Sequence, residues 1–92
     1  MESNEISLHQ VRVFQFLSGS NGWCTAIDVA AGSNVAKRTA RAHLLKFVKA
    51  GVVDQAELFP GHRYRLSPLA EKRNKSLIQR LRQAAEVFGR AP

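Results

Sequence analysis

Residues 28–53 read DVAAGSNVAKRTARAHLLKFVKAGVV, and this stretch holds two helical patterns separated by a short turn. In the second pattern, Ala40, Leu44, Phe47 and Val48 fall on one face of a helix. We therefore predict a helix over about residues 37–50 with one buried face.

The exposed side of this predicted helix is strongly basic. Residues 35–51 contain no Asp or Glu, and their cations are Lys37, Arg38, Arg41, Lys46 and Lys49. The whole chain of 92 residues has 14 Lys and Arg against 7 Asp and Glu, a formal net charge of +7. A basic excess of this size on one small domain indicates a polyanionic partner. Nucleic acid is the commonest such partner, and an anionic membrane surface is the other.

Capping and turn residues bound these two helices. Thr25 and Asp28 have the spacing of a capping box, with Asp in place of the usual Glu, so the first helix of the pair begins after Thr25. It ends near Gly32-Ser33-Asn34. Gly51 follows the second helix where a C-terminus favours positive φ.

Upstream of this pair, apolar residues at helical steps predict a first helix over about residues 7–19. Between the first helix and Thr25, Trp23 and Cys24 form an apolar step that is long enough only for a minimal strand. We expect Trp23 to lie in the core or to anchor an interface.

After Gly51 the apolar period changes to two, which is typical of strands. Residues 52–59 and 63–66 read as two strands, and Pro60 and Gly61 between them suit a type II turn. The two strands therefore predict a β-hairpin with a tight tip.

One last helix follows the hairpin. Ser67 suits its N-cap and Pro68 its first position, and we expect it to run without interruption to about Phe88. The predicted order is helix, short strand, helix, helix, two hairpin strands, helix. The fold class is mainly α with a small β-hairpin, in which residues 1–6 form a flexible N-terminus.

The segment from Asp28 to Val53 resembles the helix-turn-helix of bacterial winged-helix regulators of the MarR, ArsR and IclR kinds. The matching residues are Ala30 as the small residue between helices, Asn34 at the turn glycine, Val35 at the buried turn position, then Thr39-Ala40, Leu44-Leu45-Lys46-Phe47 and Gly51-Val52-Val53. The segment from Tyr64 to Leu69 resembles the segment that connects the wing of such proteins to a C-terminal helix. The chain departs from the pattern at Asn34, where Gly is usual, and at Ala36, where Ser or Thr usually caps the helix.

The resemblance implies a winged helix-turn-helix domain over residues 7–66 that binds double-stranded DNA, followed by a dimerisation element over residues 67–92. In this fold the N-terminal end of the second helix enters the major groove, where Arg and Lys bridge O6 and N7 of guanine. The hairpin wing reaches the phosphate backbone or the flanking minor groove. The expected DNA contacts are Lys37, Arg38, Thr39, Arg41, His62, Arg63 and Arg65.

The last helix carries more apolar surface than a solvated appendage needs. It either packs on the first helix of the same chain or pairs with its copy in a homodimer, and both arrangements are compatible. The residues expected at the dimer interface are Leu77, Ile78, Leu81, Ala85 and Phe88.

These features predict a small dimeric transcriptional regulator, acting as a repressor in the cytoplasm on nucleoid DNA. One alternative is a plasmid or phage adaptor that binds repeated DNA sites during partition or replication. An alternative of another class is a winged-helix module that binds a protein partner.

Other functional classes find little support in the sequence. The chain has no nucleophile–base pair, phosphate-binding glycine loop or paired carboxylates, so we do not expect an enzyme. We expect no cofactor and no metal site, because the three His and the single Cys lie at unrelated spacings. No apolar run reaches the roughly 20 residues that cross a bilayer, so we expect no membrane partner.

Overall fold

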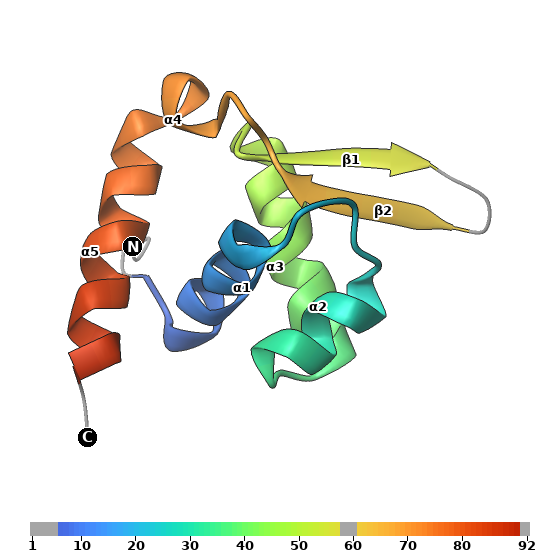
Figure 1. The fold of residues 1–92 in the computed structure, drawn as a ribbon, viewed down its shortest axis with the longest axis horizontal. Coiled ribbons are helices and arrows are strands. Elements are labelled where there is room, and N and C mark those ends of the chain that lie inside the picture. The colour runs from blue at the N-terminus through green and yellow to red at the C-terminus, as the bar shows by residue number, and fades with distance from the viewer. Residues whose placement is uncertain (1–5, 58–60, 91–92) are drawn as a thin grey trace, which may run out of the picture.

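The computed structural model describes residues 6–57 and 61–90 as helices around one two-stranded hairpin. The elements, in order, are α1 Leu8–Gly19, α2 Ala26–Ser33, α3 Lys37–Lys49, β1 Val53–Glu57, β2 His62–Leu66, α4 Ala70–Arg73 and α5 Lys75–Arg90. Figure 1 shows α1 between α5 on one side and α2 and α3 on the other, with the hairpin projecting away from α5. This is the predicted winged helix-turn-helix arrangement.

Local capping chemistry sets the helix boundaries. The hydroxyl of Thr25 accepts a bond from the Asp28 amide at 3.0 Å, and the Asp28 carboxylate accepts one from the Thr25 amide at 3.2 Å, so the predicted capping box is confirmed. Ser7 and Gln10 form the same reciprocal pair at the start of α1. Asn34 ends α2 in the left-handed conformation with φ of 58°.

The core is centred on α1, which packs against α2, α3, α5 and the hairpin strand β2. The predicted buried face of α3 is confirmed: Ala40, Leu44 and Phe47 are at most 2% exposed, and Val48 is partly buried against the same core. The surrounding buried side chains include Val13, Phe14, Leu17, Val29, Val53, Tyr64, Ile78 and Leu81. Burial of this face fixes how α3 is rotated about its own axis.

Gly32 of α2 lies against the ring of Phe16 of α1. A β-carbon at Gly32 would lie 2.0 Å from the ring of Phe16, closer than any real carbon contact. Ala30, which the sequence pattern named as the small residue between helices, is also buried. The packing of α1 on α2 therefore needs a small side chain at both positions.

The hairpin is antiparallel, and a third segment adds one bridge to it. Val53 lies opposite Leu66 at the base of β1 and β2. Cys24 exchanges two backbone hydrogen bonds of 2.8 Å with Tyr64, so the predicted minimal strand is a single bridging residue. The predicted turn at the tip begins in residues outside the described part. Gly61, where the described part of the chain resumes, has a positive φ of 86°.

The placement of Trp23 in the core is wrong. Its side chain is 38% exposed, and the guanidinium of Arg65 lies 4.6 Å from the centroid of its ring. This cation–π contact forms because β2 places Arg65 beside the loop that precedes α2.

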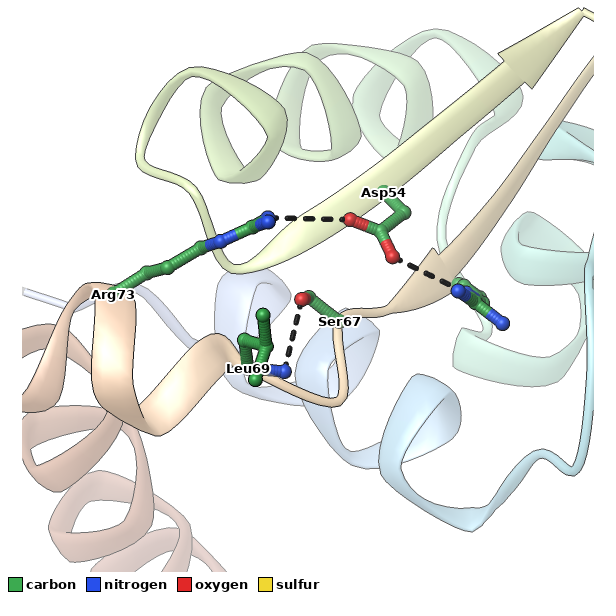
Figure 2. A network of polar contacts seen from close by, with 5 residues as sticks. Asp54, Ser67, Leu69 and Arg73 are labelled. Atoms are coloured by element: carbon green, nitrogen blue, oxygen red, sulfur yellow. Dashed lines mark hydrogen bonds and ion pairs between the residues drawn. The ribbon is translucent and has the colours of Figure 1, made fainter.

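The prediction of one uninterrupted last helix is also wrong, because the chain breaks at Asn74 into α4 and α5. Asn74 has extended φ of −151°, and its side-chain oxygen accepts a bond from the Leu77 amide at 3.2 Å, which caps α5. Its side-chain nitrogen donates to the carbonyl of Ala50 at 3.1 Å, just beyond α3. The predicted N-cap, Ser67, instead accepts a bond from the Leu69 amide in the turn before α4 (Figure 2).

We expect Asn74→Ala to lower the free energy of unfolding by about 1–2 kcal/mol, the sum of a lost N-cap and a lost hydrogen bond to a carbonyl. Asn74→Ser keeps a capping oxygen but is too short to reach Ala50, so it recovers only part of this loss. Urea denaturation followed by circular dichroism measures both. Equal stability of Asn74→Ala and the wild type would contradict the role of this side chain at the break.

Candidate nucleic-acid interface

The N-terminal half of α3 presents an exposed cationic surface. Lys37, Arg38 and Arg41 are all exposed. Lys37 is the first residue of α3, Arg41 lies on the flank of the buried face, and Arg38 lies opposite that face. The first turn of α3 contains no acid, and its N-cap, Ala36, makes no side-chain hydrogen bond. The positive end of the helix dipole is therefore not neutralised by any side chain of that turn and adds to the charge of the cations.

This cationic surface is continuous with the hairpin. One hollow along α3 is lined by Lys37, Arg38, Arg41, Ala42 and Leu45. A second hollow lies between α2, α3 and the hairpin, and its lining is Ala26, Ile27, Lys37, Arg41, Gly61, His62 and Tyr64. Since Lys37 and Arg41 line both hollows, the structure brings these two predicted residues together with the predicted His62.

Arg63 and Arg65 lie apart from these hollows. Side chains alternate across a strand, and the buried Tyr64 between them faces the core, so both arginines project from the other face of β2. Arg63 donates to the carbonyl of His62 at 3.4 Å.

Arg65 is held by an ion pair at the base of the hairpin. Its Nε lies 3.2 Å from one oxygen of Asp54, and the other oxygen lies 3.4 Å from Arg73 of α4 (Figure 2). The Asp54 carboxylate therefore offsets part of the charge of Arg65 and ties the hairpin to α4.

Two polar residues of α3 lie at the margin of its buried face. Thr39 is half-buried. His43 is half-buried too, and burial lowers the pKa of its imidazole below the ordinary value, with further lowering by the positive charges of Lys46 and His9. His43 is therefore neutral at pH 7 and adds no charge to the surface.

Three apolar residues on this surface escaped the sequence reasoning. Ile27 is 60% exposed and Leu45 is 43% exposed, and the small side chain of Ala42 is exposed between the cations and Leu45. The helical period of α3 could have identified Leu45 as exposed, because Leu45 follows the buried Leu44 by one residue and so points away from the buried face.

Two of the residues predicted for a dimer interface are corrected by the structure. Ile78 and Leu81 are 2% and 0% exposed in the core of their own chain, where α5 packs on α1, so they have no surface to offer a partner. Leu77 is partly buried against the same core, and Ala85 is half-buried. Phe88 is exposed, beside a hollow lined by Ile6, Arg80, Gln83, Ala84, Val87 and Phe88.

No helix within 6–57 and 61–90 combines the length and apolar character needed to cross a bilayer. The same residues include no group of three or more His, Cys, Asp or Glu that could hold a metal ion.

By sequence, the chain matches no protein-family model and no characterised protein. Its fold, however, is similar to solved regulators. A MarR-family transcriptional regulator from Silicibacter pomeroyi aligns over 95% of this chain and 61% of its own length, with a TM-score of 0.66 and 19% identity. BpsR of Bordetella bronchiseptica, whose DNA binding is regulated by 6-hydroxynicotinic acid, aligns over 100% of this chain and 72% of its own, with a TM-score of 0.66 and 14% identity.

RV1404 from Mycobacterium tuberculosis aligns over 95% of this chain and 62% of its own, with a TM-score of 0.61 and 18% identity. The chain thus spans about three fifths of the length of the Silicibacter and Mycobacterium proteins. At these identities the likeness concerns the fold. The chain has the winged helix-turn-helix fold that solved MarR-family transcriptional regulators share.

Proposed function

We propose that this protein is a sequence-specific double-stranded DNA-binding regulator of transcription. The observation that carries the proposal is the exposed, acid-free cluster of Lys37, Arg38 and Arg41 on α3, with His62 of the hairpin across the adjoining hollow. The similarity in fold to MarR-family transcriptional regulators supports it.

In this proposal α3 lies in the major groove of a duplex, which is wide enough to admit a helix. Arg38 and Arg41 donate to guanine edges, while Lys37 and the hydroxyl of Thr39 bind phosphates. His62 and Arg63 bind the backbone beside the groove, as a wing does. Arg65 contributes less to binding, because the carboxylate of Asp54 already holds its guanidinium.

A mobility-shift titration with random duplex DNA tests the proposal. We expect binding at low ionic strength that weakens steeply with added salt, with a log–log slope of about −0.9 for each phosphate neutralised. Failure to bind any duplex at low ionic strength would remove the proposed function. Binding with a flat salt response would contradict the electrostatic role of α3.

At the tightest site selected from a random pool, we expect Arg38→Ala and Arg41→Ala each to cost about 1–3 kcal/mol of binding free energy and to relax base preference. Arg82→Ala is the matched control, since it removes an exposed α5 cation whose ion pair with Glu71 is itself exposed. Equal losses on every duplex sequence would assign the two α3 arginines to phosphates instead of bases.

The proposed regulator acts as a homodimer and, by occupying promoter DNA, as a repressor in the cytoplasm. Val87 and Phe88, which are 68% and 38% exposed, extend an apolar patch at the end of α5 that includes the half-buried Ala84. A second copy presents the same apolar patch about a two-fold axis, so two such patches are complementary without any opposite charge.

We expect the wild type to sediment as two chains and Val87→Glu to raise the dimer dissociation constant by about tenfold or more, which corresponds to about 1.4 kcal/mol. Leu69→Glu is the control, because Leu69 is an exposed apolar residue at the start of α4, away from this patch. A monomeric wild type, or equal dissociation constants for both variants, would contradict dimerisation through α5.

A further inference from the structure

One stripe on the exposed surface of α3 combines two cations with two apolar residues. Arg38, Arg41, Ala42 and Leu45 are spaced three, four and seven residues apart along one side of the helix, so their side chains form one stripe. All four line the same hollow and are exposed, and Leu45 keeps 43% of its surface in contact with solvent. The stripe therefore presents apolar surface directly beside cations on the side of α3 that faces solvent.

We propose that Ala42 and Leu45 read the 5-methyl groups of thymine, next to guanines read by Arg38 and Arg41. This inference rests on the proposed function. The 5-methyl group of thymine is the one apolar feature of the major-groove edges, and small apolar side chains contact it. The stripe therefore matches a short sequence in which guanine and thymine adjoin.

The arrangement along the helix limits where the thymines lie. Seven residues separate Arg38 from Leu45, which corresponds to about 10.5 Å along a helix axis. With base pairs about 3.4 Å apart, a helix that follows the groove places the thymine contacts within about three base pairs of the guanine contacts. Arg38 and Leu45 mark the two ends of the segment that is read.

The charge of the hollow favours DNA over a protein partner for this apolar stripe. Lys37, Arg38 and Arg41 line the hollow together with Leu45, and the described lining contains no acid. Burying these cations against a neutral protein surface costs desolvation energy. A duplex neutralises them with phosphates and guanine acceptors while Leu45 is covered by a methyl group.

Uracil lacks only the 5-methyl group of thymine, so its substitution isolates the proposed contact. In the duplex selected from a random pool, each thymine near the guanines is replaced by deoxyuridine in turn. We expect at least one replacement to weaken wild-type binding about fourfold, which is the effect of losing the burial of one methyl group. Leu45→Ala should bind the thymine duplex more weakly and should lose most of this discrimination.

Leu69→Ala is the matched control, since it makes the same change at a position 48% exposed outside α3. It should discriminate thymine from uracil as the wild type does. Wild-type binding that is indifferent to every uracil, or undiminished discrimination by Leu45→Ala, would overturn the inference. Either result leaves the proposed function standing, whereas absence of any duplex binding at low ionic strength removes both.

Discussion

The rotation of α3 about its own axis is the constraint on which the surface of this protein depends. Leu44 and Phe47 are buried to 2% exposure or less against α1 and the hairpin base, and such side chains tolerate little displacement in a close-packed interior. With that face fixed, helical periodicity requires Arg38, Arg41 and Leu45 to project outward together. Core packing and the composition of the exposed surface are therefore two consequences of one orientation.

The first turn of α3 is less stable than it would be with a side-chain cap and an acidic residue. Ala36 leaves the first amides of α3 without a side-chain cap, which costs about 1 kcal/mol relative to Ser or Thr. Cations at a helix N-terminus are also unfavourable, because the dipole there is positive. A bound polyanion reverses both costs, since phosphate accepts from free amides and neutralises the cations. The neighbouring helices, whose capping boxes are complete, show no such deficit.

Features encoded within four residues of one another were predictable from the sequence. The Thr25–Asp28 capping box, the left-handed Asn34 and the buried face of α3 are of this kind. The break at Asn74 was not predictable, because one of its two bonds joins residues 24 apart in the chain. The apolar stripe of α5 was visible too, but periodicity alone does not reveal whether α1 or a second copy covers residues such as Ile78. At the candidate site, the cations were named from their pattern, and the helical period also indicates that Leu45 is exposed. The hollow that Lys37 and Arg41 share with His62 was not predictable in this way, because it depends on how the hairpin packs beside α3.

Two polar connections supplement the buried packing of α5 on α1 and tie α4 and the start of α5 to the rest of the domain. Asn74 joins the start of α5 to the carbonyl of Ala50, and Asp54 joins Arg73 of α4 to Arg65 of the hairpin (Figure 2). In the proposed dimer through α5, these links would lie between the shared axis and each copy of α3. The spacing of two DNA half-sites, which must be about one helical turn or a multiple of it, then depends on how rigidly this junction is held. Because exposed ion pairs contribute little on their own, Asn74, whose side chain bonds at both ends, is the stronger determinant of that geometry.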